Sequence, residues 1–120
     1  MKISNDYEGS SIEILSYNDK DNSAVLSLRK ENGEYSQYYN FFVQNNDNVD
    51  GYIYIQNIKL SKYYDKDSIF FPYKRLEGQS TWKRMDNTSF SVQDEQLVIK
   101  VEPFEKCEIS YVPRYTNENL

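Results

Sequence analysis

Apolar and polar residues alternate along most of the chain, with a period close to two and in runs too short for an amphipathic helix. In Gln96–Val101, every second residue is Leu, Ile or Val, and these side chains share one face of an extended strand. In Glu105–Tyr111, Cys107 and Ile109 alternate with charged residues in the same way. We therefore expect β-strands with one buried face, and we expect Cys107 to be a small residue of the core.

The remaining chain repeats this pattern with many aromatic and β-branched residues, which favour strands. Polar, turn-forming stretches separate the runs, as at Asn18–Asn22 and Asn45–Gly51. About nine short strands at intervals of roughly 8–12 residues predict an all-β fold, an antiparallel β-sandwich that is jelly-roll-like. The other predicted strands are Ser11–Tyr17, Ala24–Arg29, Tyr35–Gln44, Tyr52–Leu60, Ser68–Tyr73, Thr81–Met85 and Ser89–Gln93.

The length and composition fit one folded domain. The chain has 120 residues, of which 38% are hydrophobic and 16% aromatic. Aromatic rings bury about 150–250 Å² each, so they compensate for the low hydrophobic fraction. No stretch approaches the roughly 20 apolar residues of a membrane helix, and the first residues lack the apolar segment of a signal peptide. We expect a cytoplasmic protein with no membrane partner.

Charge and residue usage exclude several function classes. The net charge is -5, with 14 basic and 19 acidic residues, so a nucleic-acid partner is not expected. The chain has no His and one Cys, which removes His-based zinc sites, Ser-His and Cys-His nucleophile pairs, and an intrachain disulfide. We assign no catalytic residue, no metal ligand and no cofactor to this chain.

Two polar patterns are weak candidates for chemistry. Asn46, Asn48, Asp50 and Gly51 match the front half of a calcium-binding loop, but Asn57 stands where the bidentate Glu belongs, so we expect a polar hairpin loop. The carboxylate pairs Asp65 with Asp67 and Glu105 with Glu108 have the chemistry of an acid–base pair. We expect all four side chains to lie on the solvated surface.

The abundance of Tyr suggests a second kind of site, since exposed rings on a sheet face stack on sugars. Trp82, Tyr52 and Tyr54 are the main candidates for ligand stacking. The rings alternate along predicted strands, so we expect most of them to serve the core or an interface instead. The further candidates are Tyr38, Tyr39, Tyr63 and Tyr64.

Five segments resemble a known family in their order and residue pattern. These are Tyr39–Val43 (YNFFV), Gly51–Lys59 (GYIYIQNIK), Phe71–Tyr73 with Trp82–Arg84, and the final Ile109–Leu120 (ISYVPRYTNENL). Together they resemble the amino-terminal domain of zinc carboxypeptidases of the cytosolic carboxypeptidase-like group. The final segment resembles a P-Y-T-Y-x-x-L stretch that leads into the peptidase domain, with an inserted Arg114 and with Asn117 in place of an aromatic residue.

The resemblance implies that residues 1–112 form a non-catalytic accessory domain and that residues 113–120 are a linker toward a peptidase domain. That domain of the same polypeptide is the expected partner, and it would carry the zinc through a His-x-x-Glu pair and a later His. We expect it to be contacted by Tyr111, Pro113, Tyr115, Thr116 and Leu120. A carbohydrate-binding module and a stand-alone protein-interaction domain remain the alternatives.

Overall fold

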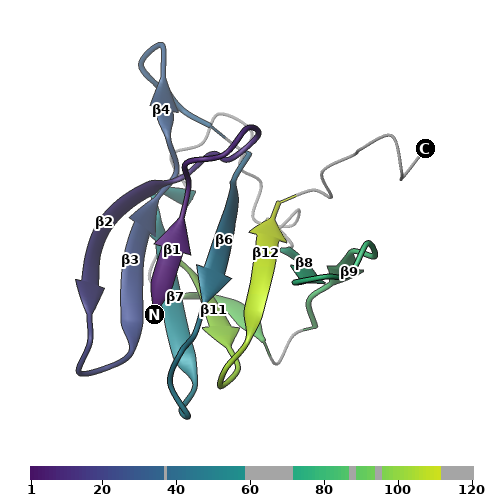
Figure 1. The fold of residues 1–120 in the computed structure, drawn as a ribbon. Coiled ribbons are helices and arrows are strands. Elements are labelled where there is room, and N and C mark those ends of the chain that lie inside the picture. The colour runs from purple at the N-terminus through teal and green to yellow at the C-terminus, as the bar shows by residue number, and fades with distance from the viewer. Residues whose placement is uncertain (37, 59–71, 87–88, 94–95, 112–120) are drawn as a thin grey trace.

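The computed structural model describes residues 1–36, 38–58, 72–86, 89–93 and 96–111. All labelled elements in this part of the chain are strands, arranged as two five-stranded sheets and one two-stranded hairpin. The two sheets form two layers packed face to face (Figure 1). This architecture confirms the predicted all-β sandwich. Within the described ranges, no helix is long and apolar enough to span a membrane.

Each sheet combines strands that are distant in sequence. In spatial order, sheet A contains β1 (Lys2–Ser4), β6 (Asn40–Gln44), β12 (Lys106–Ser110), β8 (Tyr73–Leu76) and β9 (Lys83–Arg84). Sheet B contains β10 (Phe90–Gln93), β11 (Gln96–Val101), β7 (Gly51–Gln56), β3 (Ser23–Ser27) and β2 (Glu13–Asn18). The separate hairpin consists of β4 (Lys30–Glu31) and β5 (Glu34–Tyr35).

The core lies between the sheets and is built by the alternation that the sequence predicts. Ile53 and Ile55 of β7 are wholly buried and lie opposite Ile99 and Leu97 of β11. Cys107 enters the same core from β12 and is also wholly buried, which confirms its predicted role. Each fully buried aliphatic side chain contributes about 1.5–3 kcal/mol relative to an exposed one.

One strand pairing departs from the antiparallel prediction. β3 runs parallel to β7, with Ala24 opposite Ile53 and Leu26 opposite Ile55. Parallel neighbours cannot be joined by a tight hairpin, and here the chain passes through β6 of sheet A between them. The other strand pairs within the two sheets are antiparallel. The jelly-roll-like connectivity stays a prediction, because residues 59–71, between β7 and β8, lie outside the described residues.

The predicted strand Tyr35–Gln44 is wrong in its first half. β5 ends at Tyr35 and β6 begins only at Asn40. The β4–β5 hairpin turns at Asn32 and Gly33, whose φ angles of 51° and 82° are both positive, as a two-residue type I′ turn requires. An Asn-Gly pair is the usual sequence of such a turn. The residues that flank it here are charged and do not alternate with apolar ones, so the hydrophobic pattern does not predict this hairpin.

The number of strands exceeds the predicted nine or so because several strands are very short. β1 has three residues and a single apolar side chain, Ile3, so it shows no alternation. The predicted strand Thr81–Met85 shrinks to the two residues of β9. Only the end of the predicted Ser68–Tyr73 falls within the described residues, and β8 extends from Tyr73 to Leu76.

Tyr17 links the two sheets along one open side of the sandwich. It lies on the edge strand β2, and its hydroxyl accepts a hydrogen bond from Ile3 N at 3.2 Å and donates one to Ile3 O at 3.5 Å. Ile3 belongs to β1, an edge strand of sheet A. Free backbone groups on an edge strand invite pairing with another chain, so this hydroxyl protects one residue of that edge.

Candidate functional site

A row of side chains crosses the outer face of sheet A. Ser4, Phe42, Glu108 and Arg75 lie opposite one another on four adjacent strands. The neighbours of Glu108 along β12, Cys107 and Ile109, point into the core, so Glu108 points outward. The strand register therefore places an acidic side chain, Glu108, beside a basic one, Arg75, on the face of sheet A that is not packed against sheet B.

Glu108 is the centre of a polar network on this face. Arg75 Nη2 donates to Glu108 Oε1 at 2.7 Å, and Asn40 Nδ2 donates to Oε2 at 2.8 Å. The side chains of Glu108 and Arg75 are only 8% and 19% exposed. The Arg75 guanidinium also lies 4.9 Å from the centre of the Trp82 ring, within cation–π range. The pair is thus held in one arrangement and is weakly screened by water.

A groove lies beside this network. It has a volume of 460 Å³ and is lined by Ser4, Tyr7, Glu8, Phe42 and Glu108. The Tyr7 hydroxyl donates to Asn40 Oδ1, which connects the groove wall to the network. The Glu108 charge is compensated by Arg75. The groove thus provides a packing surface with a fixed polar wall.

The expectation that Glu105 and Glu108 are both solvated is wrong. Glu108 is buried by the network, and Glu105 forms an ion pair with Lys74 at 2.8 Å. Burial lowers the pKa of Lys74, but the hydrogen bond and the charge of Glu105 outweigh this effect, so the pKa is raised overall. Burial also raises the pKa of the Cys107 thiol, helped by the Glu105 charge, so the thiol stays neutral. Asp65 and Asp67 lie outside the described residues.

Tyr111 marks the end of the described chain and follows β12 directly. Its ring lies 6.0 Å from the ring of Tyr39 at an angle of 59°, and its backbone N donates to Tyr39 O at 3.0 Å. Burial raises the pKa of the Tyr39 hydroxyl well above its usual value, and Tyr111 adds to the shift. Tyr111 is half-buried against the sandwich. The other predicted contact residues, Pro113, Tyr115, Thr116 and Leu120, lie outside the described residues.

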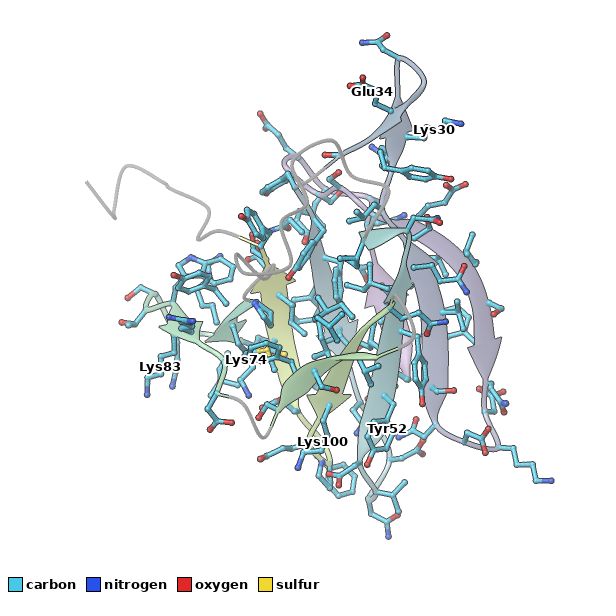
Figure 2. All side chains as sticks on the ribbon, turned by 180° about the vertical axis from the view of Figure 1, so that it is seen from behind. Lys30, Glu34, Tyr52, Lys74, Lys83 and Lys100 are labelled. Carbon is cyan, nitrogen blue, oxygen red and sulfur yellow. The ribbon has the colours of Figure 1, made fainter. Side chains whose placement is uncertain are left out.

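The candidate stacking residues do not form one platform. Tyr52 and Tyr54 lie two residues apart on β7, on the outer face of sheet B, and Figure 2 shows Tyr52 beside Lys100. Trp82 instead precedes β9 of sheet A and packs on Arg75. Tyr39 is wholly buried, as expected for a core residue. Tyr38 is half-buried, with its hydroxyl donating to Gly9 O at 3.0 Å, and Tyr63 and Tyr64 lie outside the described residues.

The calcium-like loop is organised by a residue that the motif does not include. Asn45 is wholly buried, and its Nδ2 donates to Val49 O at 2.9 Å and Glu102 O at 3.0 Å. Its Oδ1 accepts hydrogen bonds from Asp47 N and Asn22 Nδ2. No group of three or more His, Cys, Asp or Glu side chains suited to a metal ion occurs in the described part of the chain.

Sequence reasoning missed the Arg75–Glu108 pair for a definable reason. Arg75 lies on β8, and the predicted strand in this region ends at Tyr73, before Arg75. Alternation assigns Glu108 to the outer face of its strand, as the structure shows, but it does not reveal what lies opposite it. Glu108 stands between the core residues Cys107 and Ile109, and a carboxylate in that position is the sign of a paired charge that the sequence offers.

The family model of the cytosolic carboxypeptidase N-terminal domain matches residues 3–115. The chain belongs to this family. No curated protein sequence matches it.

Solved structures place this carboxypeptidase N-terminal domain within longer chains. One is a putative carboxypeptidase A from Shewanella denitrificans, with 25% identity and a TM-score of 0.80 over 99% of this chain. Metallo-carboxypeptidases from Pseudomonas aeruginosa and Burkholderia cenocepacia share the fold at 20% and 15% identity, with TM-scores of 0.77 and 0.75 over 99% and 98% of this chain. The domain spans 31%, 31% and 30% of these three chains, respectively.

Proposed function

We propose that this chain is a non-catalytic accessory domain of a zinc carboxypeptidase, which packs on the peptidase domain and helps to shape the rim of its substrate groove. The observation that supports this most strongly is the coverage. Nearly the whole chain corresponds to about a third of each solved carboxypeptidase, so more than half of each relative lies outside the matched part. In this proposal, that remaining part contains the hydrolytic centre.

The residue inventory supports locating the zinc elsewhere. Catalytic zinc in hydrolases is held by three protein ligands, usually including His, with the fourth position open to water. This chain has no His, and its one Cys is buried in the core, so its residues do not fit such a site. We therefore derive no hydrolytic step from this chain. In the proposal, residues 1–112 are the accessory domain, residues 113–120 the linker, and the whole polypeptide is cytoplasmic.

The proposed contact with the peptidase domain begins at Tyr111. This ring is already half-buried against Tyr39, so it fixes the direction in which the chain leaves β12. Pro113, Tyr115, Thr116 and Leu120 are the further proposed contact residues. Interfaces between domains of one chain bury about 600–1,500 Å² and are more polar than cores. The groove on the outer face of sheet A suits such an interface, because both polar and apolar side chains line it.

A sugar-binding function is less well supported. Stacking sites need several rings on one accessible surface, whereas Trp82 and the Tyr52–Tyr54 pair lie on different sheets. The Arg75 guanidinium also covers one face of the Trp82 ring, so that face is not open to a sugar. A panel of glycans that leaves the Trp82 fluorescence unchanged would remove this alternative.

The proposed contact is tested by hydroxyl-radical footprinting of the whole polypeptide and of the 1–120 chain. We expect Tyr111 and Tyr115 to be oxidised more slowly in the whole polypeptide, because the peptidase domain covers them. Tyr52, at the other end of the domain, is the control and should react equally in both. Equal oxidation of Tyr111 and Tyr115 in the two samples would refute the contact.

A further inference from the structure

The β4–β5 hairpin projects beyond the body of the sandwich (Figure 1). It continues directly from β3, and Ser36 N donates to Arg29 O at 2.8 Å, which closes its base. Its turn has the positive φ angles of a type I′ turn, and Lys30 Nζ lies 5.5 Å from the centre of the Tyr35 ring. Figure 2 shows Lys30 and Glu34 on this projection, away from Tyr52 and Lys100 at the opposite end.

A groove lies at the base of the hairpin. Its volume is 520 Å³, and its lining includes Arg29 and Lys30 together with Ile12 and Ile14. Asn5 and Glu13 complete the lining, so the cations outnumber the single carboxylate. Within the described ranges, the Arg29 side chain has no hydrogen-bond or ion-pair partner. An unpaired guanidinium next to apolar side chains is a ready receptor for a carboxylate, which it can bind through two parallel hydrogen bonds.

The hairpin lies at the same end of the sandwich as Tyr111, the last described residue. Tyr111 N donates to Tyr39 O, and Tyr39 is only three residues from Ser36 at the hairpin base. Ser110 lies opposite Asn40, and Asn40 pairs with Ser11, next to the Ile12 of the groove. In Figure 1, the hairpin and the end of β12 both lie opposite the loops that join β2 to β3 and β6 to β7. Tyr111 therefore lies at the same end of the sandwich as the hairpin.

We propose that the β4–β5 hairpin is a docking arm for the peptidase domain and that the groove at its base receives an Asp or Glu side chain of that domain, bound by Arg29 and Lys30. The inference rests on the proposed function and assigns one interface to it. The occupant is identified by charge complementarity and by the roughly two thirds of each solved relative that lie outside this domain. Arg29 and Lys30 are both exposed, so their charges are accessible to a side chain of a docked domain.

Carbodiimide cross-linking of the whole polypeptide tests the docking arm, since this reagent joins an amine to a carboxylate only when the two are in contact. We expect a Lys30 cross-link to an Asp or Glu beyond residue 120, mapped by mass spectrometry. Lys20 is the internal control, because it is exposed in the β2–β3 turn at the opposite end and should give no such product. Arg29→Glu should abolish the Lys30 product, whereas Lys20→Glu should leave its yield unchanged.

The possible outcomes separate this inference from the proposed function. If lysines elsewhere in residues 1–111 cross-link to the peptidase domain but Lys30 does not, the docking arm is overturned and the accessory role stands. If neither cross-links nor protection of Tyr111 are found between the two parts, the proposed function fails as well. Lys30→Arg keeps the charge but removes the reactive amine, so loss of the product in this variant with an unchanged melting temperature confirms the assignment.

Discussion

At the scale of single residues, the most informative feature is a charge that the sandwich buries on its outer face. Glu108 is held by Arg75 and Asn40, and Arg75 in turn packs on Trp82. Taking two charges out of water is costly, and removing only one partner leaves the other uncompensated. The pair therefore fixes the relative positions of β8 and β12, while its net contribution to stability is small.

Glu108→Ala should destabilise the domain because it leaves the Arg75 charge without its partner. Arg75 keeps some exposure to water, so we expect a loss of about 2–4 kcal/mol in the free energy of unfolding. Urea denaturation of the two proteins measures this loss. Glu77→Ala is the matched control, since Glu77 is exposed in the turn after β8, and it should change stability by less than about 0.5 kcal/mol. Equal losses for the two variants would contradict a structural role for the pair.

The Lys74–Glu105 pair makes stability depend on pH at the alkaline end. The pKa of Lys74 is raised in the folded state above its ordinary value of 10.5, so its contribution is present below that pH and is lost as pH rises through the raised pKa. Lys74→Met should therefore lower stability by about 1–2 kcal/mol near neutral pH, and this difference should shrink at strongly alkaline pH. Lys20→Met should show no such pH dependence. A Lys74→Met difference that stays constant across the alkaline range would contradict the coupling.

The buried thiol gives a chemical test of the core. Burial raises the pKa of Cys107, and thiolate is the reactive form, so the folded protein should resist thiol reagents. We expect a colorimetric disulfide reagent to react with no thiol in the native state and with one after unfolding in guanidinium. Rapid reaction of the native protein would show that β12 does not hold this residue in the core.

At the scale of elements, strand prediction succeeded where the alternation was long. β11 spans the predicted Gln96–Val101, and β12 lies within the predicted Glu105–Tyr111. It failed for β1 and the β4–β5 hairpin, since strands of two or three residues carry too few apolar side chains to show a period. The parallel pairing of β3 with β7 was not predictable either, because alternation assigns a buried face but no neighbour.

The edge of β1 depends on the hydroxyl of Tyr17. Tyr17→Phe removes both hydrogen bonds to Ile3, so we expect a stability loss of about 1 kcal/mol and faster exchange of the Ile3 amide. Tyr52→Phe is the control, because Tyr52 lies on a central strand with an exposed side chain. The edge account would be wrong if Ile3 exchanged at the same rate in both variants.

At the scale of the whole molecule, the sequence predicted the fold class and the family, but it did not predict the two grooves on the surface. The lack of His removed His-based zinc sites from consideration, and the order of aromatic segments pointed to the family that residues 3–115 match. The groove beside Glu108 and the groove at the hairpin base were not predictable. The groove beside Glu108 combines side chains that are distant in sequence, whereas the groove at the hairpin base draws on residues 5–30. In both, the proximity follows from the folded arrangement, which alternation alone does not specify.

The most direct test of the central claim is the release of carboxy-terminal residues from a peptide mixture, measured in parallel for the whole polypeptide and for the 1–120 chain with added zinc. We predict zinc-dependent release by the whole polypeptide and none by the 1–120 chain, because this chain has no His and its described residues contain no cluster of metal-binding side chains. Zinc-dependent release by the 1–120 chain alone would contradict the account.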